Sequence, residues 1–382
     1  AYDLPRIRPL DVDGVALVTS SPLVWIAMPL LVVITAVLVF IAYALIRFTP
    51  IISRMFESSP MFIPLRITPL AEGEHVRFRT DDGLTLAGTY LRRRSERRTG
   101  VLIFCHEFLS DRWSCIPYLD PLRDLGFDVF TFDFRNHGAS DSDSGYRDLQ
   151  WVTDHEASDL RAAISYLKTR ADHDPAGVGL FGVSRGACAA LVVAGNENSV
   201  WGVVTDGAFP TRGTMLSYIL RWTELYVRRP YFRVFLPTRL LRLLGWAARR
   251  RSEVRLGCRF TNVERAVKRI APRPWLAIHG EKDNYIGPDI ARRLFAIGGE
   301  PKEFWLVHNA KHNRCREIAP ALYAERLASF MLQHAPRRFE SEPLPKSEPT
   351  ASQRVARNEQ RVATTSSASG SRISGTPVAI RG

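Results

Sequence analysis

One pentapeptide in the middle of the chain has the residue types and spacing for nucleophilic chemistry. It is Gly182-Val183-Ser184-Arg185-Gly186, which follows a short apolar run and precedes an Ala-rich run ending at Ala194. A serine held at a sharp turn between a strand and a helix needs neighbours without side chains two residues away on either side, because strand and helix must pack closely. The turn aims the next backbone N–H and the helix N-terminus at an oxyanion. We therefore predict that Ser184 is a nucleophile.

The same region contains a second glycine pattern with a different chemical meaning. Residues Gly177-Val178-Gly179-Leu180-Phe181-Gly182 match G-x-G-x-x-G. A dinucleotide-binding motif of this kind should follow a strand and open a helix. Here the glycines lie before and within the predicted strand, so we do not expect a dinucleotide to bind at this position.

A serine is a weak nucleophile unless a base takes its proton and a third group orients that base. The base is expected after the last predicted strand, residues 303–307, where His312 lies in the following loop. His308 stands at the strand end and is the alternative. We predict His312 as the base.

The orienting carboxylate is expected beyond the carboxyl end of an earlier strand. Asp283 follows the predicted strand 275–278 and is the first choice, with Glu281 as a weaker one. Asp206, after the preceding strand, is the main alternative. The order Ser184, Asp283, His312 is the order in which α/β hydrolases carry their catalytic residues.

The oxyanion needs two backbone donors. One is the N–H of Arg185, directly after the serine, and the second is expected in the loop after Cys105, from Phe108 or Glu107. His106 and Glu107 stand in the same loop and would modulate the site. We expect His106 to form loop hydrogen bonds rather than act as a base.

The elements that position these residues alternate along the chain. We expect a hairpin at 75–91, strands at 101–105, 127–132, 177–182, 200–205, 275–278 and 303–307, and helices at 157–168, 187–194, 289–296 and 318–333. Strands alternating with helices imply a parallel sheet built from βαβ units. The sequence therefore predicts an α/β fold.

An uncharged segment near the N-terminus is long enough to cross a bilayer. Residues 23–46 are rich in Leu, Val, Ile and Ala, and about 20 such residues span a bilayer core. The segment lacks the basic start and the small-residue cleavage site of a secretory signal. We predict a transmembrane helix at 23–48 between a flank at 1–22 and a proline-containing linker at 49–73. A slight excess of arginine after the helix favours a cytoplasmic catalytic region.

Residues 210–262 form an insertion between two predicted strands. From Arg212 to Arg259 it holds twelve arginines and two acids, interleaved with aromatic and aliphatic residues at helical spacing. We expect a helical cap that rests on anionic lipid of the membrane, with plain solvation of the arginines as the alternative. No recognition motif accompanies the charge, so a nucleic-acid partner is not expected.

Residues 336–382 have few apolar residues and are predicted to be a disordered tail.

The overall composition fits a globular protein, with 46% hydrophobic residues and a formal net charge of +13. Its five cysteines are widely spaced, so neither a disulfide framework nor a zinc site is predicted. The run Asp172-His173-Asp174 resembles a metal cluster, but Pro175 follows it and a solvated turn is expected. We expect no bound metal.

Residues 74–335 resemble the α/β-hydrolase superfamily, and look most like its serine-aminopeptidase-like group, which includes monoacylglycerol lipases. The matching segments are Asp133–Ser140, Gly182–Gly186, His279–Asp283 and His312. The resemblance implies an α/β-hydrolase fold with a mostly parallel sheet, flanking helices and a helical cap. It also implies a serine hydrolase of esters, thioesters or amides that needs no cofactor.

Together these features predict a membrane-anchored enzyme that cleaves a carboxylic ester, a lipid or a small acyl ester, through an acyl-enzyme on Ser184. A peptidase or amidase of the same mechanism is the first alternative. One residue departs from the family pattern, because Glu107 stands where a glycine usually follows the histidine. A carboxylate there would oppose an oxyanion unless it turns away or pairs with Arg185. Glu107 therefore favours a second alternative, a catalytically weak binding protein tethered to the membrane.

Overall fold

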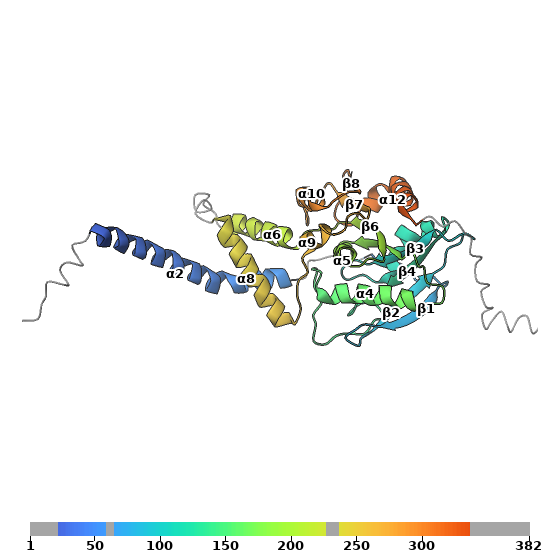
Figure 1. Ribbon diagram of the computed structural model, residues 1–382, viewed down its shortest axis with the longest axis horizontal. Coiled ribbons are helices and arrows are strands. Elements are labelled where there is room, and N and C mark those ends of the chain that lie inside the picture. Colours follow the sequence, from blue (N-terminus) through green and yellow to red (C-terminus); the bar gives the residue numbers. More distant parts are fainter. Residues whose placement is uncertain (1–21, 59–64, 227–236, 337–382) are drawn as a thin grey trace, which may run out of the picture. The chain divides into compact units, whose positions relative to one another are not determined.

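The structure is a computed structural model that describes residues 22–58, 65–226 and 237–336 (Figure 1). The predicted flank up to residue 21 and the predicted tail from residue 337 onward lie outside the described residues, as does part of the predicted cap, residues 227–236. All described residues belong to one compact unit, Ala1–Arg338.

An eight-stranded sheet forms the centre of this unit, in the order β1-β2-β4-β3-β5-β6-β7-β8. β2 runs antiparallel to both of its neighbours, and the other pairs are parallel. The predicted hairpin and parallel strands are thus confirmed. The strands are β1 Glu74–Arg79, β2 Thr85–Leu91, β3 Gly100–Cys105, β4 Phe127–Phe132, β5 Val178–Val183, β6 Val200–Asp206, β7 Trp275–Gly280 and β8 Lys302–Val307.

Helices cover both faces of the sheet, which is why the inner strands are continuous apolar runs without polar alternation. Successive residues of β3 show the two faces, since Ile103 packs into one core cluster and Leu102 and Phe104 into the other. α4, α5, α9 and α10 pack on the Ile103 side, whereas α3 and α12 pack on the Leu102 side.

The short helices are η1 Arg112–Cys115, α3 Ile116–Leu119, η2 Asp120–Arg123, α9 Val263–Val267 and α11 Cys315–Ile318. The longer ones in the sheet region are α4 Asp154–Thr169, α5 Arg185–Ala194, α10 Pro288–Ile297 and α12 Pro320–His334.

α4 begins three residues earlier than predicted because a capping box starts it. The Thr153 hydroxyl accepts a hydrogen bond from the N–H of His155 at 3.2 Å, and the Glu156 carboxylate accepts one from the N–H of Thr153 at 2.7 Å. These two bonds satisfy backbone donors that have no acceptor inside the helix.

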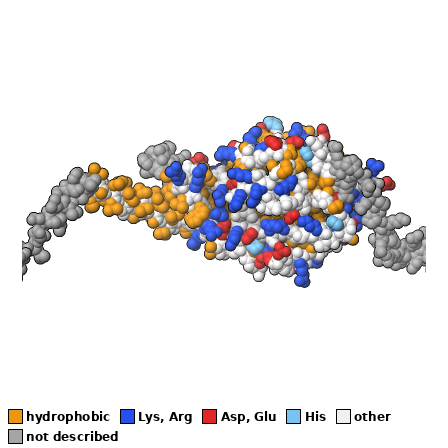
Figure 2. Space-filling view, viewed as in Figure 1, with side chains coloured by type: hydrophobic (Ala, Val, Ile, Leu, Met, Phe, Trp, Pro, Cys, Tyr) orange, Lys and Arg blue, Asp and Glu red, His pale blue; other side chains and the backbone are white. Residues whose placement is uncertain are grey.

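The N-terminal helix α2 runs from Pro22 to Glu57 and is longer than predicted. Residues 49–57 are helical, so the predicted linker does not begin at residue 49. Its part Trp25–Glu57, which contains an 18-residue stretch with a mean hydropathy of 2.8, is long and apolar enough to cross a membrane by length and composition. The apolar side chains between Trp25 and Ile46 are mostly exposed, and Figure 2 shows them as a continuous hydrophobic surface along the helix.

In the described residues, the inserted segment forms the long helices α6 Thr211–Tyr226 and α8 Thr238–Leu256. α8 packs along the inner end of α2, where the Ser53 hydroxyl donates to the carbonyl of Ala248 at 3.0 Å. The Ser252 hydroxyl donates to Glu57 Oε1 at 2.8 Å, and Arg255 forms an ion pair with the same carboxylate.

The last turn of α2 also enters the core of the sheet region. Phe56 is fully buried, its ring contacts Trp151 edge-on at 6.0 Å, and its carbonyl accepts a hydrogen bond from Trp151 Nε1 at 2.8 Å. We call this contact region of Ser53, Phe56 and Glu57 with α8 and Trp151 the α2–α8 junction. It makes the inner end of α2 part of the same folded unit as the sheet.

Candidate active site

Ser184 lies at the sharp turn between β5 and α5, as the pentapeptide predicts. Its backbone has φ 52° and ψ −115°, a conformation that costs a non-glycine residue about 1–3 kcal/mol. A Cβ on Gly182 would lie 2.5 Å from the carbonyl oxygen of Gly186, and one on Gly186 would lie 2.1 Å from that of Cys105. Both glycines are therefore required by the close approach of α5 to β5 and β3.

Three side chains from three strand ends form one chain of hydrogen bonds. Ser184 Oγ lies 2.9 Å from His312 Nε2, and His312 Nδ1 lies 2.6 Å from Asp283 Oδ2. A carboxylate at Nδ1 keeps the proton on that nitrogen, so Nε2 accepts the hydroxyl proton of Ser184. All three residues are buried. This arrangement can transfer a proton from the hydroxyl to the imidazole.

The Asp283 carboxylate is fixed on its other side by the backbone. Its Oδ1 accepts hydrogen bonds from the N–H groups of Tyr285 and Ile286, each at 2.9 Å. Burial alone would raise the pKa of Asp283, but the hydrogen bond and the charge of His312 outweigh it and hold the pKa below its usual value. Asp283 therefore stays ionised and can stabilise an imidazolium.

The alternative base and the weaker alternative carboxylate form a pair of their own outside the site. His308 Nδ1 lies 2.7 Å from Glu281 Oε2, and the His308 side chain is 78% exposed. The structure thus brings His312 rather than His308 to Ser184.

Asp206, the main alternative carboxylate, lies behind Ser184 and has a different partner. Its Oδ2 accepts a hydrogen bond from the hydroxyl of Tyr323 at 3.0 Å, and its backbone carbonyl accepts one from the N–H of Ser184 at 2.8 Å. Complete burial raises the pKa of Asp206 to about 6. The carbonyl of Asp206 therefore helps to hold the serine turn, while its carboxyl group faces α12.

The predicted oxyanion donors lie on two sides of the serine. Arg185 is the first residue of α5, so its N–H belongs to the first helical turn and has no intrahelical acceptor. Phe108 follows β3 and lines the same cavities as Ser184 and His312. Both residues are therefore next to the position that a substrate oxygen would occupy.

The side chain of Arg185 holds the Phe108 loop instead of pairing with Glu107. Its guanidinium lies over the Phe108 ring at 5.1 Å and donates to His137 Nε2 at 3.2 Å and to the carbonyl of Leu149 at 3.1 Å. Its nearest carboxylate partner is Glu156, at 3.5 Å. Of the two arrangements considered for Glu107, the pairing with Arg185 is therefore not the one observed.

Glu107 instead accepts a hydrogen bond from the Ser114 hydroxyl at 3.2 Å. Burial raises the pKa of Glu107 above its ordinary value. His106 is fully buried and forms loop hydrogen bonds, as predicted, since Nδ1 donates to the Glu107 carbonyl at 2.7 Å and Nε2 accepts from the Phe134 N–H at 3.1 Å. Burial lowers the pKa of His106 well below its usual value, so the ring is neutral.

Two cavities meet at Ser184 and His312. The larger, about 660 Å³, is lined by Phe108 and by the charged residues Arg66, Lys311, Arg314 and Arg316, and we call it the basic cleft. The smaller holds only about 10 Å³ of free space and is lined mainly by apolar and aromatic side chains. We call it the apolar cavity, and its lining includes Trp151, Phe209, Tyr218 and Ile286.

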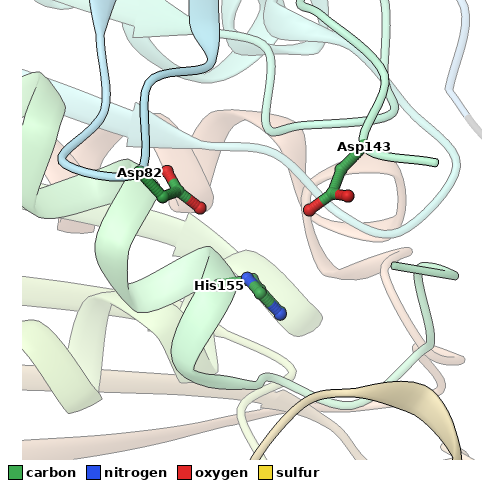
Figure 3. Close-up of side chains that lie close together, drawn as sticks. All are labelled: Asp82, Asp143 and His155. Carbon is green, nitrogen blue, oxygen red and sulfur yellow. The ribbon is translucent and has the colours of Figure 1, made fainter. Parts of the chain in front are cut away.

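A group of metal-ligating side chains lies elsewhere, at Asp82, Asp143 and His155 (Figure 3). Arg135 already supplies a cation there, because its Nη1 lies 2.8 Å from Asp82, 3.3 Å from Asp143 and 2.8 Å from His155 Nδ1. A guanidinium among these ligands makes the group an ion-pair network rather than a metal centre. In the Asp172-His173-Asp174 run, Asp172 likewise pairs with Arg92 and Arg170.

Several residues that line the site were not predicted from the sequence, and Trp151, Lys311 and Arg316 are three of them. Trp151 lines the apolar cavity, and no motif marks it. Lys311 and Arg316 line the basic cleft and stand within four residues of His312. The density of basic residues around the predicted histidine was the signal that could have found these two.

Comparison with known proteins identifies the family of the chain. A family described as "Alpha/beta hydrolase family" matches residues 102–328. An uncharacterized protein of Mycobacterium tuberculosis is 25% identical over 273 residues, covering 72% of this chain and 84% of its own length. The uncharacterized protein YfhR of Escherichia coli is 22% identical over 265 residues, covering 68% and 80%.

Solved structures share the fold at lower sequence identity. An esterase of Pyrococcus furiosus superposes with a TM-score of 0.53 and 20% identity, covering 73% of this chain and 100% of the esterase. The α/β hydrolase GrgF of a Penicillium species gives a TM-score of 0.51 and 20% identity, covering 69% and 99%. Since the family match spans more than half of the sequence, the chain belongs to the α/β hydrolase family.

Proposed function

We propose that the chain is a serine hydrolase that cleaves a carboxylic ester through an acyl-enzyme on Ser184. The observation that carries the proposal is the hydrogen-bonded chain from Ser184 Oγ to His312 at 2.9 Å and from His312 to Asp283 at 2.6 Å. Its order and geometry match those of a nucleophile, a base and an orienting carboxylate.

In this mechanism His312 Nε2 takes the hydroxyl proton as Ser184 Oγ attacks the ester carbonyl carbon. The backbone N–H groups of Phe108 and Arg185 donate to the carbonyl oxygen as it becomes negative. His312 then gives its proton to the oxygen of the departing alcohol, and the acyl group stays on Ser184. A water molecule, deprotonated by His312, releases the acid and restores the serine.

We propose an ester rather than an amide as the substrate because the solved structures with a similar fold include esterases, such as the Pyrococcus furiosus protein. Glu107 also turns toward Ser114, which removes one reason to expect a catalytically weak protein. The peptidase alternative uses the same residues and differs only in substrate.

Activity-based labelling tests the proposal. The full chain in detergent should react with a fluorophosphonate probe, and Ser184→Ala should not. Ser110→Ala is a matched control, because Ser110 is also buried but donates to the carbonyl of Leu65 instead of a histidine. A panel of acyl esters and aminoacyl amides then separates esterase from amidase. A folded wild-type chain that neither reacts with the probe nor cleaves any ester would refute the proposal.

We further propose that α2 is a single-pass membrane anchor with the catalytic region on the cytoplasmic side, and that the cap rests on anionic lipid. α8 carries exposed arginines at positions 239, 242, 250, 251 and 255. It also exposes Trp246 and packs against α2, so these groups lie beside the proposed anchor. Arginine with exposed aromatic residues is the composition of surfaces that bind anionic membranes.

Binding of the cap to lipid can be measured in a shortened chain that lacks the proposed membrane-spanning part of α2. A chain that starts at residue 47 keeps the inner end of α2 and should bind vesicles containing phosphatidylglycerol more tightly than vesicles of phosphatidylcholine. Added salt should weaken that binding. Replacing Arg242 and Arg250 by Glu should reduce it, while Arg269→Glu, on the sheet region, should not. Equal vesicle binding by all variants would show that the α8 arginines are solvated and do not bind lipid.

A further inference from the structure

The basic cleft and the apolar cavity suit different halves of an ester. An ester places its acyl part and its alcohol part on opposite sides of the attacked carbonyl carbon. The apolar cavity is lined by Trp151, Phe209, Tyr218 and Ile286, and its free space of about 10 Å³ is small. The basic cleft of about 660 Å³ has room for a larger and polar group.

The position of the general acid decides which half occupies the basic cleft. His312 must give a proton to the oxygen of the departing alcohol, so the alcohol leaves beside the imidazole. The chain on both sides of His312 forms a wall of the basic cleft, through Lys311, Asn313 and Arg314. His312 itself lines both cavities, but its neighbours Lys311, Asn313 and Arg314 line only the basic cleft, which favours this cleft for the alcohol part and the apolar cavity for the acyl part.

Charge in the basic cleft is only partly neutralised. Arg66 pairs with Asp111 at 3.0 Å and Arg314 with Glu317 at 2.5 Å. Within the part of the chain that the structure describes, Lys311 and Arg316 have no carboxylate within 4 Å. Two cations thus face the cleft without a counter-charge.

Arg316 is held in place although it lacks an acidic partner. Its Nε donates to the carbonyl of Pro117 at 2.5 Å, and its guanidinium lies over the Tyr118 ring at 5.9 Å. Its two Nη groups have no protein acceptor among the described residues. An ordered guanidinium with free donors is suited to an anionic oxygen.

We propose that the alcohol part of the substrate carries an anionic group, a phosphate or a carboxylate, which Lys311 and Arg316 bind in the basic cleft. The inference rests on the proposed hydrolysis at Ser184 and names the substrate class for it. The acids that line the cleft do not cancel this charge, because Glu317 pairs with Arg314 and Glu107 is buried against Ser114.

A matched pair of substrates tests the proposal with the full chain in detergent. The pair is 1-butyryl-glycerol 3-phosphate and 1-butyrylglycerol, which differ only in the anionic group of the alcohol. Wild type should show a kcat/KM at least about tenfold higher for the phosphate ester, and the preference should shrink with added salt. A phosphate carries more charge than a carboxylate, so an equal kcat/KM for the two substrates would overturn the proposal for both anions.

Substitutions assign the preference to the two side chains. Lys311→Gln and Arg316→Gln should each reduce the preference, the ratio of kcat/KM for the phosphate ester to kcat/KM for the neutral ester, about three- to tenfold. Lys311→Arg should retain it, and so should the control Lys268→Gln, whose exposed side chain is outside the cleft. Because the neutral ester reports any disturbance of His312, a parallel loss with both substrates would overturn the assignment to Lys311.

A binding measurement separates this proposal from the proposed hydrolysis. Calorimetry with the Ser184→Ala variant should detect glycerol 3-phosphate but not glycerol, and Lys311→Gln in that background should weaken binding. Binding in the absence of any ester cleavage would support the cleft and refute the hydrolase. Ester cleavage without phosphate preference or binding would refute the cleft alone.

A longer acyl chain identifies where the anion comes from. 1-Lauroyl-glycerol 3-phosphate and 1-lauroylglycerol in mixed micelles form a second matched pair. A phosphate preference in this pair indicates a lipid headgroup, and one confined to the butyryl pair indicates a water-soluble ester. Either result supports the anionic alcohol, whereas no preference in either pair contradicts it.

Discussion

The catalytic end of the sheet and the α2–α8 junction both bury polar groups, but they order them in different ways. At the sheet, Ser184, Asp283 and His312 each follow the end of a strand, and backbone hydrogen bonds fix the loops around them. At the junction, Glu57 from the N-terminal helix meets Ser252 and Arg255, about two hundred positions along the chain. The first region depends on parallel strands that end together, and the second depends on two helices packed side by side.

The difference predicts different consequences of mutation. A change at the sheet end removes a proton-transfer step while the strands still hold the loops. A change at the junction removes packing between distant segments and leaves the hydrogen bonds of Ser184 and His312 intact. We therefore expect sheet-end variants to lose rate and junction variants to lose stability.

The largest effect is expected from Asp283→Asn. The amide oxygen can still accept the N–H groups of Tyr285 and Ile286, so the fold should persist. The side chain no longer holds the proton on His312 Nδ1, and a change of this kind lowers kcat by about 10⁴. The measurement is ester hydrolysis together with thermal unfolding. Glu281→Gln, at the exposed pair with His308, is the control and should stay within about twofold of wild type. A full loss of rate in the control and a normal rate in Asp283→Asn would reverse the assignment.

Phe56→Ala should have the largest effect at the junction. Its ring is fully buried against Trp151, and truncation of a buried phenylalanine costs about 3–5 kcal/mol. We expect the Tm of the catalytic region to fall by roughly 10 °C, while the kcat of the folded protein stays near wild type. Phe40→Ala, on the exposed part of α2, should leave Tm almost unchanged in the same detergent. An unaltered Tm for Phe56→Ala would mean that α2 is not part of the folded unit in solution.

The two regions also differ in how far the sequence could predict them. The turn at Ser184 is visible because two glycines and one serine mark it, and strands β3 to β8 are visible as apolar runs. Asp283 follows β7 and Asp206 is the last residue of β6, so both carboxylates lie at strand ends. The choice between them depended on which one reaches His312 and on the hydrogen bond from the Tyr323 hydroxyl to Asp206. Such distances come from tertiary packing and have no local pattern.

No local sequence pattern indicated the α2–α8 junction. The prolines of residues 49–73 favour a linker, but Pro50 lies inside α2 and the helix continues to Glu57. Packing of α8 and the burial of Phe56 stabilise this last turn, and tertiary contacts of this kind override local propensity. The hydrogen bond from Ser53 to Ala248 spans 195 positions. No pattern within a short window could have indicated it.

Asp206→Asn should alter the pH dependence of the free energy of unfolding. We expect this effect to be smaller than that of Phe56→Ala and larger than that of the last variant below. Burial raises the pKa of Asp206 from 3.8 to about 6, so the folded state keeps the proton at a pH where the unfolded state releases it. The resulting stability is complete below pH 3.8 and is lost as the pH rises through 6. The asparagine variant should avoid this loss, which is on the order of 3 kcal/mol. Chemical denaturation at pH 4 and pH 8 measures it.

Asp283→Asn should change the pH dependence of stability in the direction opposite to Asp206→Asn. The pKa of Asp283 is lowered in the folded state, despite its burial, through the hydrogen bond and charge of His312. Its stabilising contribution is present above its ordinary pKa and is lost as the pH falls. The stability that Asp283→Asn loses relative to wild type should therefore be larger at pH 4 than at a pH below 3.8, whereas Asp206→Asn should gain stability relative to wild type as the pH rises from 4 to 8. Parallel pH profiles for the two variants would contradict the difference between these carboxyl groups.

The smallest effect is expected from Ser252→Ala at the junction. The variant removes one donor to the Glu57 carboxylate, which is almost completely buried but keeps its ion pair with Arg255. A hydrogen bond to a charged group contributes about 1.5–3 kcal/mol, and the remaining ion pair should hold the loss near the lower limit. Arg255→Ala is the informative partner, because the Arg255 side chain is half exposed. If the serine hydrogen bond anchors the carboxylate, Ser252→Ala will lower the free energy of unfolding more than Arg255→Ala does. The reverse order would show that charge pairing, rather than the hydrogen bond, holds Glu57 at the junction.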